Sequence, residues 1–379
     1  MLLVVTLIHL LSGRTTLAAP STQPIACDQA RGGPYGPAMT VDICFSYYTR
    51  KPLATTFSAI RNRGFTCVHL VDYGAGCSKP SRMKPVADAA RAEGLTPVLC
   101  IYPGTHSALY AAHPEWRQRM LTGIDGKCDW RTYLCPNRSE FVTAYCEQIE
   151  RQMRECGFEA VQIAEIWFEN WGGPQIEGQT NARYACVCDA CLEKFRRRTG
   201  VDALPMLTDP QSPSFYQKPE NAALYAHWVN MRIQTVQDFG KAIIAAARRA
   251  NPKTCIKTMY MSDARVALDG SREFLGTDLD RMIKEWQPDV LTIQDAWQDW
   301  LQKDLQPGFI RDYAKAYRDR VRKLHPNIWL VSHADIGSKP ESKRSIEWIQ
   351  SFARETLAAG FNAPCFYEWH ISTMADPEK

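Results

Sequence analysis

Three carboxylates in this sequence stand where short apolar stretches end. Glu165 follows the mostly apolar run Val161–Ala164, Asp295 ends "VLTIQD", and Glu368 follows "CFY". An acid at the mouth of a buried strand is costly unless it is paired or has a function. Two facing carboxylates can hydrolyse a glycosidic bond, because one protonates the departing oxygen and the other acts from the opposite side. We therefore predict that Glu165 is a catalytic acid, with Glu368 as the preferred partner and Asp295 as its competitor; the structural alternative is a solvated or arginine-paired Glu165.

Aromatic and polar residues gather at the same predicted strand ends. An aromatic ring there could stack against a sugar, although each ring alone is as well explained by ordinary packing. His333 stands beside Asp335, which could tune a neighbouring carboxylate. The residues predicted to bind substrate are Asp72, Tyr102, Trp167, Tyr260, Trp297, His333, Asp335 and Trp369.

A cluster of cysteines has the spacing of a metal site. Cys186, Cys188 and Cys191 form a C-x-C-x-x-C motif directly before a predicted helix, and Cys128 or Cys135 in the preceding long loop could supply a fourth thiolate. Four thiolates suit tetrahedral zinc and leave no open position for catalysis, so the predicted metal is structural. Disulfides and unpaired buried thiols are the alternatives.

Eight short β-like runs, separated by longer amphipathic stretches, would have to position these residues. This alternation is typical of a parallel sheet built from βα units, and eight such units in one chain predict an α/β fold of the (β/α)8 TIM-barrel type. A doubly wound sheet is the alternative, but no glycine-rich phosphate loop follows any run. Long loops are expected after strands 3 and 4, at 104–137 and 167–219. The predicted strands cover 39–45, 66–71, 96–102, 160–166, 254–261, 289–294, 328–332 and 363–367.

The helices carry recognisable boundary signals. Asn137, with Glu140 three residues later, predicts an N-cap pair, and a long helix is expected over 221–251. Gly64, Gly94 and Gly157 each follow a charged helix end and precede a strand, where a left-handed C-cap is needed.

Composition sets the broad class of protein. With 379 residues and 45% hydrophobic content, the chain can build a large core, and its net charge of +4 is spread along the sequence, so nucleic acid is not an expected partner. The apolar stretch Leu2–Leu11 and the small residues that follow predict a signal peptide at 1–19, and hence a secreted or periplasmic protein; because no basic residue precedes the stretch, a core segment stays open. No other segment approaches membrane-spanning length. We expect residues 20–379 to form one catalytic barrel without an organic cofactor.

Three segments in chain order, "YLCPNRSEFVTAY", "AVQIAEIW" and "YACVCDACLEKFRRRTG", resemble glycoside hydrolase family 42, the β-galactosidases of clan A, and related barrel hydrolases. In that family a Cys-Pro-Asn segment gives one zinc ligand, the Cys-x-Cys-x-x-Cys segment gives three, and the glutamate between them is the acid/base. The resemblance, which covers about Tyr133–Gly200, therefore implies Glu165 as acid/base and four zinc ligands: Cys135, Cys186, Cys188 and Cys191.

The sequence also departs from that family. Ala164 stands where the family has an asparagine, and the seventh strand ends in 332–335 without the family's nucleophilic glutamate. The extra domains after the family's barrel are not found either, so the resemblance implies a relative rather than a member.

Three functions are compatible with these features. The first is a glycoside hydrolase, retaining, that acts on an oligo- or polysaccharide. The second is a metal-dependent sugar isomerase, epimerase or lyase with His333, Asp335, Glu368 and His69 as ligands. The third is a carbohydrate-binding barrel without catalysis, which the missing asparagine and glutamate would favour.

Overall fold

The structure is a computed structural model that describes residues 32–74, 79–128, 130–169, 172–262 and 269–375. The predicted signal peptide at 1–19 lies outside these residues, so its prediction stays open. Within the part of the chain that is described, no helix combines the length and the apolar character needed to cross a bilayer.

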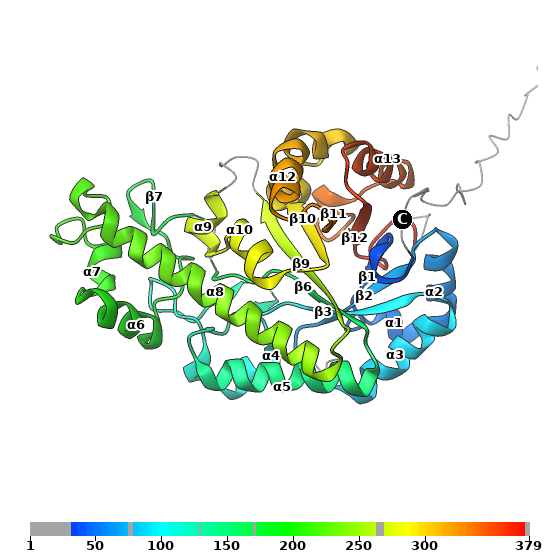
Figure 1. Cartoon of the computed structure of the whole chain (residues 1–379), viewed down its shortest axis with the longest axis horizontal. Coiled ribbons are helices and arrows are strands. Elements are labelled where there is room, and N and C mark those ends of the chain that lie inside the picture. Colours follow the sequence, from blue (N-terminus) through cyan, green and yellow to red (C-terminus); the bar gives the residue numbers. More distant parts are fainter. Residues whose placement is uncertain (1–31, 75–78, 129, 170–171, 263–268, 376–379) are drawn as a thin grey trace, which may run out of the picture.

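Eight parallel strands close into a barrel, as the alternation of runs predicts (Figure 1). Around the barrel they follow the order β1-β12-β11-β10-β9-β6-β3-β2, so each strand pairs with its neighbours in the chain of βα units. The (β/α)8 fold is thus confirmed, and the strand C-termini meet at one mouth. The strands are β1 (Ala38–Val41), β2 (Cys67–Asp72), β3 (Thr96–Ile101), β6 (Ala160–Ile163), β9 (Cys255–Ser262), β10 (Val290–Asp295), β11 (Trp329–Asp335) and β12 (Ala363–Tyr367).

Small and β-branched side chains fill the barrel at the N-terminal ends of its strands. Such residues suit the crowded interior of a barrel, because inward positions alternate along each strand. This layer also explains four of the lone cysteines as small core residues: Cys67, Cys255 and Cys365 belong to it, and Cys100 lies in a neighbouring buried cluster.

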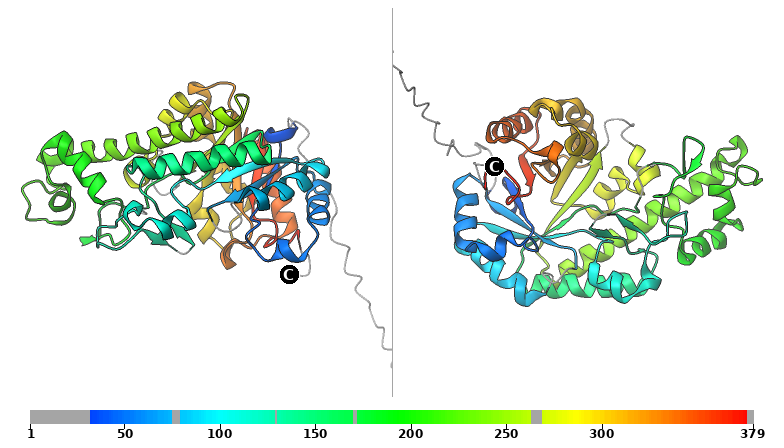
Figure 2. Two further views of the ribbon diagram at one scale, coloured as in Figure 1. Left: turned by 90° about the horizontal axis from the view of Figure 1, so that it is seen from below. Right: turned by 180° about the vertical axis from the view of Figure 1, so that it is seen from behind.

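Helices cover the outside of the barrel and connect its strands. They are α1 (Tyr47–Arg50), α2 (Leu53–Asn62), α3 (Pro80–Ala92), α4 (Ser107–Ala112), α5 (Ser139–Cys156), α6 (Asp189–Thr199), α7 (Ala203–Thr208), α8 (Ala222–Ala250), α9 (Gly270–Leu275), α10 (Leu279–Arg281), α11 (Ala296–Leu301), α12 (Ile310–Leu324) and α13 (Ile346–Ala358). Figure 2 shows α8 running from the barrel wall out to the region of α6 and α7, which projects to one side. The long helix predicted at 221–251 is α8, and it packs against α5.

Local signals set the helix ends with one exception. Gly64, Gly94 and Gly157 all have positive φ, of 89°, 75° and 64°, as predicted for left-handed caps. The predicted Asn137 cap is wrong, because the N-cap residue of α5 is Arg138 and no side chain caps the helix. The side chain of Asn137 donates a hydrogen bond to Cys191 instead, because the fold brings this cysteine, from a distant segment, next to it.

Both predicted long loops are present and contain short elements. The loop after β3 carries α4 and the hairpin β4 (Lys127–Cys128) with β5 (Arg131–Thr132). The loop after β6 carries the hairpin β7 (Gln175–Ile176) with β8 (Gln179–Thr180), followed by α6 and α7.

Candidate active site

A cavity of about 180 Å³ opens at the C-terminal mouth of the barrel. Its wall combines aromatic rings with charged groups that come from five strands or from the loops that follow them, which is where active sites of this fold lie. The lining residues are Tyr102, Trp130, Arg131, Glu165, Met259, Gln294, Trp300, His333, Asp335, Ser338, Lys339 and Tyr367.

Glu165 lies in this cavity, two residues after the end of β6. Its φ is +48°, a left-handed conformation that costs an L-residue on the order of 1–2 kcal/mol. Backbone strain of this kind persists only where the surroundings enforce it, and it clusters at functional sites. The conformation turns Glu165 out of the strand direction and into the mouth.

Arg131 of β5 holds the carboxylate of Glu165 in a two-point ion pair. Arg131 Nε donates to Oε2 at 2.8 Å and Nη2 donates to Oε1 at 2.9 Å. Indole rings of Trp130 and Trp300 flank the guanidinium, with centroids 4.6 and 5.6 Å from its central carbon. Burial acts to lower the pKa of Arg131, but the charge and hydrogen bonds of Glu165 outweigh it and raise that pKa above the usual value. Glu165 is therefore paired with an arginine and is at the same time part of the cavity wall, so its predicted catalytic role stays a prediction.

Asp335 is the second carboxylate in the cavity lining, at the end of β11. Going around the barrel, β11 is three strands from β6. Its oxygens accept hydrogen bonds from the amides of Gly337 and Ser338, at 3.0 and 2.8 Å, and from both serine hydroxyls nearby, of Ser338 and Ser342. Burial raises the pKa of Asp335, while these hydrogen bonds oppose the rise.

His333 lies on the same strand and presents an imidazole to the cavity. Its side chain is buried, and burial lowers its pKa to about 3, so the ring is neutral at physiological pH. Nδ1 has no hydrogen-bond partner in the part of the chain described. A neutral ring nitrogen of this kind can donate to or accept from a substrate hydroxyl.

Sequence reasoning missed Asp299, a buried residue outside the lining that hydrogen-bonds two residues of the cavity wall. Its Oδ2 accepts from Gln294 Nε2 at 2.8 Å and from the Asp335 amide at 2.7 Å. Burial and the neighbouring charge of Asp335 raise the pKa of Asp299 well above its usual value. Gln294 is thereby held with its amide in the cavity wall. The only sequence signal was a carboxylate four residues beyond a strand-end acid.

The structure does not bring Glu368 or Asp295 into the cavity lining. Glu368 is fully buried and accepts hydrogen bonds from the amides of Asp42 and His370, at 3.0 and 2.8 Å, and from the hydroxyl of Tyr48. Asp295 is also fully buried and caps α11, accepting from the Gln298 amide at 3.1 Å. Both carboxylates thus have hydrogen-bond partners in neighbouring segments and lie outside the cavity lining, and their predicted catalytic roles stay predictions.

The predicted substrate-binding residues divide into two groups. Tyr102, His333 and Asp335 line the cavity, whereas Asp72 is buried and accepts from the Gly74 amide and from Gln152 Nε2, both at 3.0 Å. The remaining aromatic residues also lie outside the lining: Trp167 packs in a buried cluster with Tyr133, Met261 and Leu275, Trp369 lies in the main core, and Trp297 is exposed on α11.

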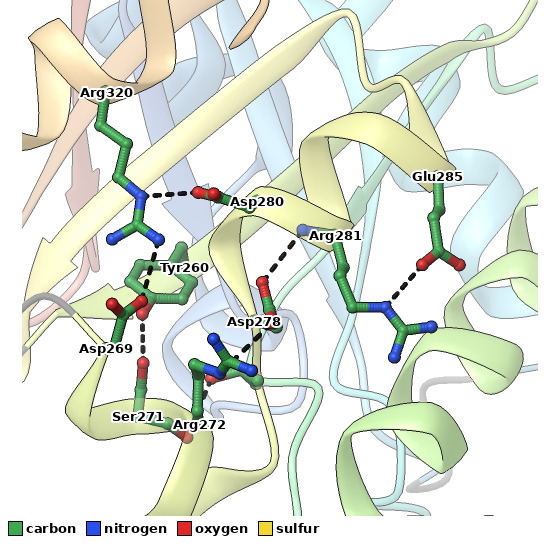
Figure 3. A network of polar contacts seen from close by, with 10 residues as sticks. Tyr260, Asp269, Ser271, Arg272, Asp278, Asp280, Arg281, Glu285 and Arg320 are labelled. Atoms are coloured by element: carbon green, nitrogen blue, oxygen red, sulfur yellow. Dashed lines mark hydrogen bonds and ion pairs between the residues drawn. The ribbon is translucent and has the colours of Figure 1, made fainter. Parts of the chain in front are cut away.

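Tyr260 faces the outer helices instead of the mouth (Figure 3). Its hydroxyl contacts that of Ser271 on α9, and its ring lies 5.9 Å from Tyr317 on α12. Arg320 nearby binds Asp269 and Asp280, at 2.9 and 2.6 Å. The alternation of side chains along β9 gives the physical reason, because every second residue points out of the barrel.

The cysteine cluster assembles as predicted, with Cys135 and not Cys128 as its fourth member. The Sγ atoms of Cys135, Cys186, Cys188 and Cys191 all lie within 4.8 Å of one another, and all four residues are buried. Cys128 lies elsewhere and accepts from Arg183 Nη2 at 2.8 Å. None of the four cysteines is disulfide-bonded, so the disulfide alternative for this motif is wrong.

The cluster has the geometry and electrostatics of a thiolate metal site. Cys135 Sγ lies 3.5 Å from the Sγ atoms of both Cys188 and Cys191, close to the roughly 3.8 Å edge of a tetrahedron with Zn–S bonds of about 2.3 Å. Asn137 Nδ2 donates to Cys191 Sγ at 3.1 Å. Hydrogen bonds from its three sulfur neighbours lower the pKa of Cys188, while burial raises that of Cys135. The donor set therefore fits a metal ion and can hold one.

The metalloenzyme ligand set predicted from His333, Asp335, Glu368 and His69 is not assembled. His69 Nε2 lies 2.9 Å from the Lys257 ammonium inside the barrel, and burial together with that charge lowers the pKa of His69 well below its usual value. Among the described histidines, cysteines and acids, the four cysteines form the one group that meets the distance criterion for a metal.

The fold, a closed (β/α)8 barrel, is shared with solved structures although no similar sequence is found. No family model matches the sequence, and no curated protein matches it either. Solved structures with similar folds include the β-galactosidase of the psychrophile Marinomonas ef1, with a TM-score of 0.63 and 12% identity over 88% of this chain and 54% of that one. The α-L-fucosidase isoenzyme 2 of Paenibacillus thiaminolyticus has a TM-score of 0.55 and 13% identity over 90% of this chain and 47% of that one.

A catalytic mutant of a family 42 β-galactosidase from G. stearothermophilus is similar in the same way, with a TM-score of 0.57 and 14% identity over 88% of this chain and 51% of that one. The chain spans about half the length of these structures. At such identities the likeness concerns the fold, and it is consistent with a distant relative of family 42.

Proposed function

We propose that this protein is a glycoside hydrolase that uses Glu165 as its general acid/base and Asp335 as its second carboxylate. The observation that carries the proposal is the position of Glu165, held in a strained conformation inside an aromatic-lined cavity that also contains Asp335. Hydrolysis of a glycosidic bond needs two acids on one cavity, and these are the two whose side chains line it. The glycosidases with similar folds support the reaction class.

In the proposed reaction, the sugar stacks against the aromatic wall with its scissile bond between the two acids. Tyr102, Trp130 and Trp300 offer ring faces, while Gln294 and His333 offer polar atoms for hydroxyl groups. Glu165 protonates the departing oxygen, and Asp335 attacks the anomeric carbon or activates the water that does so. Retention is the expectation implied by the resemblance to family 42.

Glutamine and asparagine substitutions test this assignment. We expect Glu165→Gln and Asp335→Asn each to lower kcat at least about 100-fold on a responsive aryl glycoside, because general acid–base catalysis contributes 10²–10⁴-fold. The control is Glu140→Gln at an exposed carboxylate on α5, which should leave turnover unchanged. Near-native turnover by folded Glu165→Gln would remove the assignment.

A carbohydrate-binding barrel without catalysis is the second candidate. The ion pair between Arg131 and Glu165 favours it, because Arg131 occupies both carboxylate oxygens of Glu165. Sugars from a screen that bind the cavity and are recovered unaltered, with no aryl glycoside turned over, would favour this function over hydrolysis.

We also propose that the four-cysteine cluster binds a structural zinc ion. A closed set of four thiolates would tie the loop after β3 to the loop after β6 and so fix the segments that flank the cavity. The proposed location is secreted or periplasmic. Cys44 is disulfide-bonded, and such bonds are typical of oxidising compartments, which supports this location.

A further inference from the structure

The cavity wall holds two basic side chains, Arg131 and Lys339, beside its two acids. Lys339 lines it at the start of a short helical turn, is exposed, and has no ion-pair partner among the described residues. Of the two acids, Glu165 is neutralised by Arg131, and Asp335 is surrounded by four hydrogen-bond donors of its own loop. A ligand that enters the cavity therefore meets an ammonium group that no carboxylate of the described residues pairs with.

Arg131 also keeps one donor group for a ligand. Its Nε and Nη2 atoms bind Glu165, while Nη1 has no hydrogen bond within the described part of the chain. A guanidinium can bind two anions along different edges, because it presents five N–H donors in one plane. The flanking rings of Trp130 and Trp300 hold that plane in place.

Another part of the wall suits an uncharged, hydroxylated group. His333 is neutral, and its Nδ1 is buried without a partner in the described structure. Gln294 is held by Asp299 at 2.8 Å. Because a buried polar atom without a partner is costly, a hydroxyl that reaches His333 would be favoured there.

We propose that the cavity takes a sugar that bears an anionic group, a uronic acid carboxylate or a sulfate ester, and that Lys339 and Arg131 bind this group. The inference rests on the proposed function, since it names the substrate class for the same cavity. The two anions share the relevant chemistry, because each offers oxygens that accept charge-assisted hydrogen bonds from ammonium and guanidinium groups.

The test compares sugars that differ only in charge. The probes are the α- and β-anomers of 4-nitrophenyl glucuronide and galacturonide, their 6-O-sulfated hexose counterparts, and the neutral glucosides and galactosides. We expect at least one anionic probe to give a kcat/KM about 10- to 100-fold above that of its neutral counterpart, as a charged hydrogen bond supplies. The carboxylate and sulfate series show which anion is preferred. Added salt should reduce this preference.

Lys339→Gln should remove most of the preference, measured as the ratio of kcat/KM for the anionic probe to kcat/KM for its neutral counterpart. Lys339→Arg should restore the preference, because the charge is kept. Lys323→Gln, at an exposed lysine on α12, is the matched control and should behave as wild type. Arg131→Lys should also reduce the preference, because one ammonium group cannot bind Glu165 at two points and still present a fork of donors to the anion.

The outcomes separate this inference from the proposed function. Neutral probes hydrolysed as fast as anionic ones, in a Glu165-dependent way, would overturn the inference and leave the hydrolase proposal standing. Anionic probes that bind by calorimetry but are not hydrolysed would support the inference and remove the hydrolase proposal. If neither anionic series binds nor reacts, the inference is overturned.

Discussion

The ion pair between Arg131 and Glu165 makes a quantitative prediction about stability. Its two hydrogen bonds measure 2.8 and 2.9 Å, and the side chains are only 16% and 9% exposed. We consider three variants: Arg131→Gln, Glu165→Gln, and the double variant. Each single change leaves one mostly buried charge without its partner, whereas the double change removes both charges.

The expected free energies follow from that geometry. Breaking a buried pair by removing one partner costs about 3 kcal/mol, because the remaining charge is left desolvated. Each single change removes the two charge-assisted hydrogen bonds between Arg131 and Glu165. The sum of the two single effects therefore counts these bonds twice, whereas the double variant loses them once. We therefore expect the double variant to be about 2 kcal/mol more stable than the sum of the two single effects would give.

Equilibrium unfolding in urea, followed by far-UV circular dichroism, measures this coupling. The control cycle uses Lys84→Gln and Asp88→Asn, a pair on α3 whose side chains are 55% and 47% exposed, and its coupling should be far smaller. Additive single effects at Arg131 and Glu165 would show that the two side chains do not hold each other, and the account of Glu165 given above would fail.

Two further predictions concern the metal and the pH dependence of stability. Elemental analysis should find about one zinc per chain, lost in Cys188→Ser and kept in Cys146→Ser, whose thiol lies outside the cluster; equal zinc in both variants would contradict the site. Burial raises the pKa of Asp42 from 3.8 to about 7; the charge of Glu368 adds to this rise, and a backbone hydrogen bond from Cys44 opposes it. Between these two pH values the folded state therefore holds a proton that the unfolded state releases. The contribution of Asp42 to stability is therefore complete below about pH 4 and is lost as the pH rises through 7. The difference in unfolding free energy between wild type and Asp42→Asn, measured by urea titration, should change across that range. A difference that stays constant with pH would contradict the raised pKa.

Much of the fold could be predicted from local patterns. The eight apolar runs, the glycines at the helix ends and the long α8 depend on periodicity and backbone preference, which neighbouring residues determine. The N-cap predicted for Asn137 was wrong because its amide has a better partner in Cys191, from a segment far along the chain.

The candidate site was harder to predict, because a strand-end carboxylate has the same sequence signature whether it faces a cavity or a neighbouring loop. Glu165, Glu368 and Asp295 all follow apolar runs, yet only Glu165 reaches the cavity. The arginine that pairs with it comes from a hairpin in the long loop predicted after the third strand, where no sequence signal pointed to Arg131 or Trp130.

The sequence by itself determined the barrel, and it determined that the three cysteines of the C-x-C-x-x-C motif lie close together. Both follow from spacing along the chain. Tertiary structure alone decided that Asp335 shares the cavity with Glu165 and that Arg131 and Lys339 lie in its wall. These contacts join segments far apart in the chain, and their distances depend on how the strands close around the barrel rather than on any local preference.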